Sequence, residues 1–379
     1  MKIEDIFSNS TFFLGAGAVA ESGCLTSGQM LRNLQEKIRK EEDDLNQEAY
    51  FYITSCLTYQ NTWKNLKNNQ DDDYNLNIED FIFIIRKIIN RDYYLPNPLV
   101  GNWSEKIIKL ESKDELIFTK LLNKISNVYL PQWLTIDKDK QKKLLDPIMN
   151  FFTETSDLNF NLDIFTLNYD LVLESFFNTD KINLINDGFT GKQWADGFDL
   201  KESTESNKYR INLYKLHGSM NWERDGELDQ VVKTDHYSNA NDPLIIFGQE
   251  AKMLSVDPFL SLTSRFKRKL EDSDFYFVIG YSFFDTYINN LLLEGVNRFP
   301  ERKMIVVNSS CKDSKKLSEK IARIQKNDFN GAYNISSISP DKIVLVNEKA
   351  GNFYDKYLGE KGKELKKLID KIGYSDEPF

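Results

Sequence analysis

The sequence predicts an α/β fold in which a mostly parallel sheet carries helices on both faces and accepts a helical insertion. Two observations support this prediction. Short apolar runs recur in the second half of the chain, and several are continuous, as expected when both faces of a sheet are covered. Amphipathic helical patterns lie between some of these runs, and this alternation is typical of parallel strands. The predicted strands are residues 11–14, 162–166, 211–216, 244–247, 275–279, 304–307 and 343–346.

The first predicted strand runs directly into a glycine turn. Residues 15–20 fit the pattern G-x-G-x-x-G/A, in which a missing side chain lets the backbone approach a pyrophosphate at a helix N-terminus. Gly15, Ala16 and Gly17 would form this cradle in the opening loop of a Rossmann-like domain. Glycines after strands also turn the chain without binding anything, so both interpretations stay open.

The segments after the glycine turn narrow the class of nucleotide-binding fold. A dehydrogenase presents an acidic residue at the end of a second strand about 20 residues beyond the loop. Here that position falls in a Lys- and Glu-rich helical pattern at residues 36–42, so hydride transfer is disfavoured. The chain contains no GxxxxGK[ST], which excludes a P-loop kinase.

Helix-like segments alternate with polar linkers from there to residue 158, with little strand pattern. We therefore expect a discontinuous Rossmann-like domain at 1–35 and 159–350 and a helical insertion at 36–158. A C-terminal helix is expected at 351–379, with the charged pattern of a surface helix at 361–372.

Polar residues follow the next two predicted strands. Asn168 and Asp170 come after strand 162–166, at the carboxyl edge where open α/β sheets bind ligands. Either residue could instead cap a helix that begins near residue 171. The chain has two histidines, and His217 follows strand 211–216 whereas His236 lies in a polar loop. His217 is thus the better candidate for an imidazole base, with a structural role as the alternative.

Two further strand ends carry weaker signals. Gly280 and Ser282 follow strand 275–279 and could offer backbone N–H groups and a hydroxyl to a phosphate. A plain turn with Ser282 capping the next helix is the alternative. Asn308 follows strand 304–307 and is placed to contact a ribose or an adenine.

The order of these motifs resembles the sirtuin-like (SIR2) family, and most of all the bacterial SIR2-like proteins of antiphage defence. The family's GAG loop matches residues 15–17, its Asn-x-Asp motif residues 168–170, its His-Gly motif residues 217–218, and its Gly-x-Ser turn residues 280–282. The resemblance covers roughly residues 8–30 and 160–310, about half of the chain.

The chain also departs from the family pattern. Val19 stands where the family usually has Ser or Thr, and Leu25 where it usually has Pro, which bears on the detailed contacts of the loop. The three cysteines are far apart, and the four-cysteine zinc module of protein-deacylating sirtuins is missing. The resemblance therefore implies cleavage of NAD itself, with water as the acceptor, more than protein deacylation.

The resemblance implies an NAD+ hydrolase that releases nicotinamide and ADP-ribose, with NAD as substrate and no metal. Asn168 would orient water and ribose, and His217 would accept a proton. Asp170 would bind the nicotinamide amide or hold its local turn. The residues implied in binding the rest of the substrate are Gly15, Ala16, Gly17, Gly280, Ser282 and Asn308.

The composition of the chain limits its expected cellular compartment and its expected partners. The net charge of −9 does not favour nucleic acid or anionic lipid, and no apolar run is long enough to span a bilayer. With scattered cysteines and no targeting pattern, we expect a soluble cytoplasmic protein. A defence NADase must be held inactive in its host, so control by homo-oligomerisation or by a separate protein is expected. At the family level that protein could be a HerA-like ATPase or another product of a defence operon.

Two alternative functions belong to other classes. One is a regulatory or scaffold module that binds NAD or ADP-ribose without turnover, although such a module needs neither Asn168 nor His217. The other is a sirtuin-type deacylase or ADP-ribosyltransferase, which the absent zinc module disfavours.

Overall fold

The computed structural model describes most of the chain. The described residues are 1–40, 44–67, 76–90, 103–112, 115–179, 182–199, 210–227, 229–234, 243–247, 257–328 and 337–373. They form two compact units. Unit 1 comprises Met1–Cys24, Ile136–Ala240 and Leu254–Phe379, and unit 2 comprises Leu25–Thr135 and Asn241–Met253. The predicted boundaries at residues 35, 158 and 350 stay predictions.

Unit 1 is built on a seven-stranded sheet in which every pair of neighbouring strands is parallel. The predicted fold class is thus confirmed. In spatial order the strands are β13 (Ile343–Val346), β12 (Lys303–Val307), β11 (Phe275–Ile279), β1 (Ser10–Leu14), β2 (Leu162–Thr166), β8 (Ile211–Lys215) and β5 (Ile185–Asn186).

The order of strands places a switch point at the centre of the sheet. From β1 the chain builds β2, β5 and β8 on one side, and it then returns to β11 on the other side of β1. The loops after β1 and β11 thus lead to strands on opposite sides of the switch point, and their neighbouring carboxyl ends are where open α/β sheets bind their ligands.

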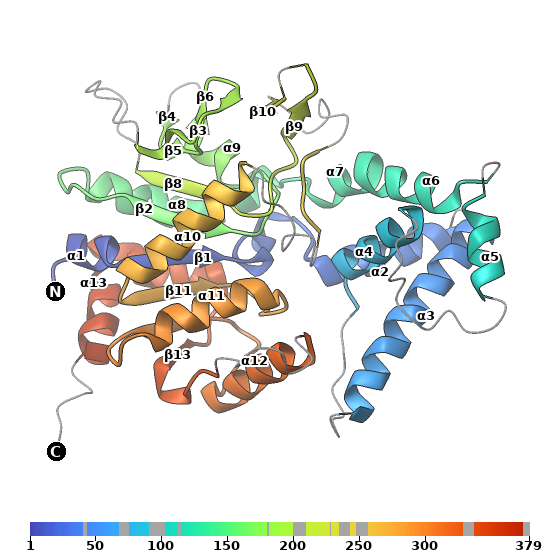
Figure 1. Ribbon diagram of the computed structural model, residues 1–379. Coiled ribbons are helices and arrows are strands. Elements are labelled where there is room, and N and C mark those ends of the chain that lie inside the picture. Colours follow the sequence, from blue (N-terminus) through green and yellow to red (C-terminus); the bar gives the residue numbers. More distant parts are fainter. Residues whose placement is uncertain are drawn as a thin grey trace. The chain divides into compact units, whose positions relative to one another are not determined.

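Alternate residues of the strands supply two apolar faces, as the period of two requires. On one face Phe12 of β1 stacks on Phe277 of β11 with ring centroids 4.8 Å apart, and Phe277 contacts Phe353 of helix α13 (Ala350–Gly373). On the other face Phe13 and Phe165 pack against Phe266 of α10 (Phe259–Asp272). Both faces are thereby covered (Figure 1).

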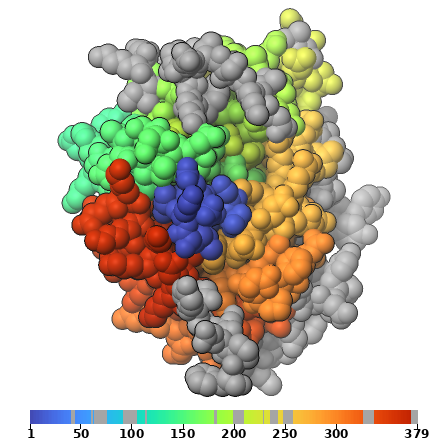
Figure 2. Space-filling model, turned by 90° about the vertical axis from the view of Figure 1, so that its left-hand side faces the viewer, coloured from blue at the N-terminus to red at the C-terminus, as the bar shows by residue number. Residues whose placement is uncertain are grey.

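Further helices complete unit 1. Helix α8 packs against α13, and α10 packs against α11, which in turn packs against α12 (Figure 1). The short helix α1 lies beside α13, where the terminal amine of Met1 is 3.3 Å from Asp370 Oδ1 (Figure 2). The bounds are α1 (Ile3–Ser8), α8 (Lys138–Glu154), α9 (Glu174–Phe177), α11 (Thr286–Asn297) and α12 (Ser314–Asp328).

Small antiparallel elements flank the main sheet. A four-stranded sheet runs in the order β6 (Phe189–Thr190), β7 (Gln193–Trp194), β10 (Gln230–Lys233) and β9 (Trp222–Asp225). Its core is the aromatic group of Phe189, Trp194 and Trp222, whose ring centroids lie 5.2 to 6.0 Å apart. A two-stranded sheet joins β3 (Asn178–Thr179) to β4 (Ile182–Asn183).

The expected C-terminal surface helix is an amphipathic helix with a buried face. Helix α13 contains a kink from Gly359 to Gly362, where the backbone is not helical. Beyond the kink its residues Leu365 and Ile369 are buried. Charged residues on the exposed face explain the surface-like pattern, because one helix can present both faces.

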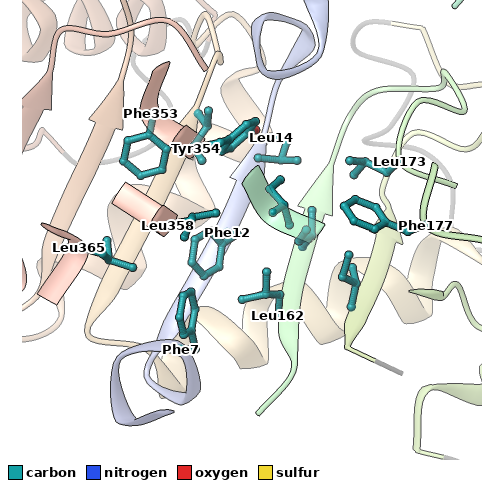
Figure 3. Close-up of a pocket in the computed structure, with 14 residues that line it drawn as sticks. Phe7, Phe12, Leu14, Leu162, Leu173, Phe177, Phe353, Tyr354, Leu358 and Leu365 are labelled. Carbon is teal, nitrogen blue, oxygen red and sulfur yellow. The ribbon is translucent and has the colours of Figure 1, made fainter. Parts of the chain in front are cut away.

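A small apolar cavity remains between the sheet and the helices that cover it (Figure 3). Its volume is about 30 Å³, and Leu358 and Leu365 of α13 line it together with Phe12 and Leu14 of β1. A cavity of this size has room for water, but bound water also needs two to four polar partners. The lining is almost wholly apolar, so the cavity is a gap in core packing.

Unit 2 is a group of helices, which confirms the predicted helical insertion as a class of structure. Its helix α4 is capped by Asn77, whose side chain accepts the Asp80 N–H. The bounds are α2 (Ser27–Lys40), α3 (Asp44–Lys67), α4 (Ile78–Ile89), α5 (Trp103–Leu110), α6 (Ile117–Lys124) and α7 (Leu130–Trp133), with a π-helical turn at Ile125–Tyr129 before α7.

The predicted strand at residues 244–247 is wrong. This segment belongs to unit 2 and has a single bridge residue, Ile245, in place of a strand. Phe247 is buried there, with the guanidinium of Arg86 from α4 over its ring at 5.1 Å. A short apolar run that packs on helices has the same pattern as a buried strand, so its sequence alone did not separate the two.

Candidate functional site

The glycine turn after β1 is packed against the turn after β11. The Gly15 N–H donates to the Ile279 carbonyl and the Gly17 N–H to the Gly280 carbonyl, each at 2.9 Å. A Cβ on Gly15 would lie 2.6 Å from Tyr281 Cα, and a Cβ on Gly17 would lie 2.8 Å from the Gly280 oxygen. Both glycines are therefore required for the close approach of two backbones across the switch point.

The residue between these glycines is placed differently. Ala16 is exposed, and its N–H makes no hydrogen bond with any residue that the structure describes. Of the three N–H groups in the turn, that of Ala16 is thus the one open to an incoming anion. Gly280 itself has φ +63°, and a Cβ there would lie 2.1 Å from the Ala18 nitrogen.

Asn168 is anchored at the carboxyl ends of β1 and β2. Its Nδ2 donates to the Gly15 carbonyl at 3.1 Å, and its backbone N–H donates to Thr166 Oγ1 at 3.0 Å. The Thr166 hydroxyl in turn donates to the Leu14 carbonyl. Asn168 Oδ1 has no hydrogen-bond partner among the described residues. The side chain is therefore held by its nitrogen and presents an open acceptor.

Asp170 takes part in a buried charge cluster beneath this loop. Its Oδ1 accepts the Val172 N–H at 2.9 Å, which is the local turn considered as its alternative role. Lys215, 2% exposed at the end of β8, donates to the Asp170 carbonyl and, at 2.7 Å, to Glu174 Oε1. Burial raises the pKa of both Asp170 and Glu174, and the Lys215 ammonium opposes that rise.

Cys24 adjoins the same cluster. Burial, with the nearby Asp170 carboxyl, raises the pKa of its thiol to about 12. The Ser22 hydroxyl points at the sulfur from 3.8 Å. A thiol in this environment stays protonated at neutral pH and is not a nucleophile.

His217 follows β8 and is 3% exposed. Its Nε2 lies 3.3 Å from Asp285 Oδ2, yet this contact lacks hydrogen-bond geometry, and Nε2 is buried without a partner among the described residues. In the sheet, β1 and β2 lie between β8 and β11, from whose loop Asp285 comes. The contact therefore joins the loops after β8 and β11 at the carboxyl edge of the sheet, where β1 and β2 lie between these two strands.

In the loop from β11 to α11, the residue that caps the helix is not the one that the sequence suggested. Ser282 is exposed and makes no hydrogen bond to the described residues, so it does not cap the next helix. The N-cap is Asp285, whose Oδ1 accepts the Ile288 N–H at 3.0 Å. Sequence reasoning missed Asp285, although an aspartate directly before a helical pattern is a known signal for a cap.

Asn308 lies at the end of β12, two strands away from β1. Its Oδ1 accepts the Ser310 N–H at 2.8 Å, so the side chain stabilises its own turn. Asn308 is partly exposed at the same sheet edge as Gly280, whose N–H donates to the Val307 carbonyl.

The structure thus gathers the sequence-predicted residues along one edge of the sheet. Backbone bonds join the loops, from Leu216 N–H to the Thr166 carbonyl and from Met220 N–H to the Tyr169 carbonyl. The second histidine, His236, lies outside the described residues. Within the described ranges, His, Cys, Asp and Glu side chains form no group of three or more that could hold a metal ion.

Comparison with protein families finds a match that covers part of this edge. Residues 163–338 match a SIR2-like domain. The match supports a likeness of this segment to the sirtuin-like family. The SIR2-like segment contains Asn168, His217, Ser282, Asp285 and Asn308, while the glycine turn precedes it.

Comparison with solved structures gives distant likenesses to Sir2 proteins. A triple mutant of Sir2 homologues with 2'-O-acetyl ADP ribose is 12% identical, with 97% of this chain and 98% of that chain covered and a TM-score of 0.44. A Sir2 homolog–NAD complex is 13% identical, with 97% and 94% covered and a TM-score of 0.43. Likenesses this distant carry no conclusion about activity. No curated protein matches the chain.

No helix in the described part of the chain combines the length and the apolar character that crossing a bilayer requires.

Proposed function

We propose that the chain hydrolyses NAD+ to nicotinamide and ADP-ribose at the carboxyl edge of β1, β2 and β8. The observation that carries the proposal is the state of Asn168, whose nitrogen is tied to the Gly15 carbonyl while Oδ1 stays open. An acceptor fixed beside a phosphate-type loop can orient a water molecule or a ribose hydroxyl. The SIR2-like match over residues 163–338 supports the same chemistry.

The reaction needs little acid catalysis. The bond between the nicotinamide nitrogen and the ribose anomeric carbon breaks with its electron pair going to the nitrogen, so the cationic ring leaves as neutral nicotinamide. The oxygen of water forms the new bond to the anomeric carbon, and one water proton must be removed. Asn168 Oδ1 would orient the water, and His217 would accept a proton from the water or from a ribose hydroxyl.

The remaining residues would bind the rest of the substrate. The Ala16 N–H and the Ser282 hydroxyl are open to the pyrophosphate, whereas Gly15, Gly17 and Gly280 would shape the loop that presents them. Asn308 would face the adenosine ribose. For Asp170 the bond to the Val172 N–H favours the turn-holding role over nicotinamide binding.

The first test is nicotinamide release from NAD+ by the purified protein and by Asn168→Ala. We expect the variant to lose activity by about 10²–10⁴-fold, the cost typical of removing one group that acts in the transition state. Asn297→Ala is the matched control, because its Nδ2 also donates to a single carbonyl, that of Ser337, but at an exposed position on α11.

Three outcomes distinguish the candidate functions. Full hydrolysis by folded Asn168→Ala would overturn the assignment of the residue. Binding of NAD+ without nicotinamide release, across candidate partners and triggers, would instead indicate a non-catalytic regulatory module. Formation of O-acyl-ADP-ribose from an acyl-lysine peptide would indicate a deacylase.

We further propose that the hydrolase acts as an effector of bacterial antiphage defence, depleting NAD when triggered. This part rests on the resemblance of the motifs and on the need to keep a cytoplasmic NADase inactive in its host. Control would come from self-association or from a separate partner such as a HerA-like ATPase. Assays with and without the products of neighbouring genes, with mass measured by light scattering, test both routes.

A further inference from the structure

We infer that Asp285 is a positioning residue for His217, holding the imidazole so that its Nδ1 faces the substrate. The inference rests on the proposed function and names a residue that the proposed chemistry does not yet include. Its basis is the 3.3 Å contact of Asp285 Oδ2 with His217 Nε2, made between loops whose strands are separated by β1 and β2.

The imidazole needs a partner at Nε2. That atom is buried and has no hydrogen bond among the described residues, and a buried polar atom without a partner is unfavourable. The carboxylate oxygen is close enough that a small rotation of the ring gives a charge-assisted hydrogen bond. Catalytic hydrogen bonds are often long or poorly aligned without substrate and tighten when it binds.

Asp285 is held so that one oxygen is free to do this. Its Oδ1 is used in capping α11, where it accepts the Ile288 N–H, and Oδ2 is left to face the ring. The Asp285 carbonyl accepts the Tyr281 hydroxyl at 3.1 Å. Asn289 Nδ2 donates to the Phe283 carbonyl at 2.7 Å, which fixes the turn before the cap.

The backbone of the turn before Asp285 is strained at Phe283. Phe283 is buried and has φ +63°, a conformation that bulky side chains rarely adopt. Such strain persists where the surrounding structure holds it and is concentrated at functional sites. Here it belongs to the segment that brings the carboxylate from Gly280 at the switch point toward His217.

The consequence for catalysis is the choice of tautomer. A carboxylate at Nε2 keeps the proton on Nε2 and leaves Nδ1 as the basic nitrogen. No described residue hydrogen-bonds to Nδ1. Nδ1 is therefore the atom available to accept a proton from water or from a ribose hydroxyl.

The decisive variant is Asp285→Asn. Asparagine is an equally good N-cap, so its one side-chain oxygen remains with the Ile288 N–H. The amide then turns its NH2 toward Nε2, which favours the opposite tautomer. We expect kcat for nicotinamide release to fall by about 10²–10⁴-fold with little change in KM, because the effect is on proton transfer.

The matched control is Asp137→Asn at the N-cap of α8, where the aspartate accepts the Lys140 N–H at 3.1 Å. It changes the same atoms in the same structural role without an imidazole beside it, so kcat should be unchanged. A melting temperature equal to that of the wild type for each variant would show that both caps survive. Wild-type kcat in a folded Asp285→Asn protein would overturn the inference.

A second readout does not depend on activity. The chain has two histidines, so ¹⁵N-histidine spectra contain two imidazoles, and a His236→Gln variant assigns them. We expect His217 to carry its proton on Nε2 in the wild type and on Nδ1 in Asp285→Asn. Unchanged His217 resonances would reject the positioning role. If the wild type released no nicotinamide either alone or with the products of neighbouring genes, the proposed hydrolase would be rejected while these spectra still decided the role of Asp285.

Discussion

At the scale of single residues, the glycines of the turn after β1 serve contact between two backbones. Their N–H groups are used by carbonyls of the β11 turn, and the Ala16 N–H is the one left open. The loop thereby acts as a fixed frame, with little freedom to rearrange around a ligand. Preorganised donors of this kind need no reorganisation when the substrate reacts.

A Gly17→Ala substitution tests this frame. The new Cβ would meet the Gly280 oxygen at 2.8 Å, and backbone atoms on both sides must shift. We expect a loss of about 1–3 kcal/mol in unfolding free energy, in the range of overpacked sites, together with loss of NAD turnover. Urea unfolding followed by circular dichroism measures the first effect.

Gly226→Ala is the control, because a Cβ there meets no described atom within 4 Å. It should be neutral or slightly stabilising through the unfolded chain. Equal stability of the two variants would contradict the close-packed frame.

At the scale of elements, α13 is an integral layer of unit 1. Its two halves, on either side of the kink, both bury apolar side chains. The kink itself is tied to α8 by the Lys361 N–H, which donates to Glu154 Oε2 at 3.1 Å. At its other end the Gly351 N–H donates to Glu21 Oε2 from the segment after the glycine turn. The helix therefore packs on the sheet face that carries Phe277 and also bonds to the segment that follows the glycine turn.

Leu365→Ala tests the role of the second half of α13. Leu365 is fully buried and lines the apolar cavity, so its truncation enlarges a space that is already unfilled. We expect a loss of about 2–5 kcal/mol in unfolding free energy. Leu260→Ala, at a position on α10 that is 52% exposed, should change it by about 0.5 kcal/mol or less. A similar small effect at both positions would show that α13 is peripheral.

At the scale of the whole molecule, unit 1 is assembled from three separate segments of the chain. The cluster of Asp170, Glu174 and Lys215 links the loop after β2, helix α9 and the end of β8. The buried Lys215 ammonium donates to the Glu174 carboxyl and to the Asp170 backbone carbonyl, and its charge also acts on the Asp170 carboxyl. Removing the ammonium leaves the carboxylates buried without a compensating charge, and this lowers the free energy of unfolding.

Lys215→Met should lower the unfolding free energy by about 3–5 kcal/mol at neutral pH. Burial already raises the pKa of Asp170 and Glu174 in the folded protein, and loss of the ammonium raises it further. The folded state then keeps protons that the unfolded chain releases near about pH 4. Stability contributed by the protonated carboxyls is present below that pH and is lost as pH rises.

The destabilisation should therefore be small near about pH 4 and should grow toward neutrality. Urea midpoints at acidic and neutral pH measure the change. Lys142→Met, which breaks the exposed pair with Asp146, is the control and should have an effect of about 0.5 kcal/mol or less. A loss at Lys215 that is the same at all pH values would exclude titration of the carboxyls as its cause.

The sequence by itself determined the class of fold and the edge on which the candidate site lies. The apolar-rich run at residues 162–166 and the continuous apolar runs at 275–279 and 343–346 form strands with those same bounds, because a strand buried on both faces has a local signature. Polar residues directly after parallel strands reach the carboxyl edge whatever the order of the strands. Asn168 and His217 could thus be placed there from local pattern alone.

Tertiary structure decided which atoms at that edge are available and which residues meet. The order of strands sets β1 beside β11, and only then do the glycine N–H groups face carbonyls. Asp285 reaches His217 across two strands, a contact between residues 68 positions apart that no local pattern encodes. The segment at residues 244–247 belongs to the helical unit 2. Its apolar pattern predicts that it is buried, but not whether it packs on helices or pairs with a strand.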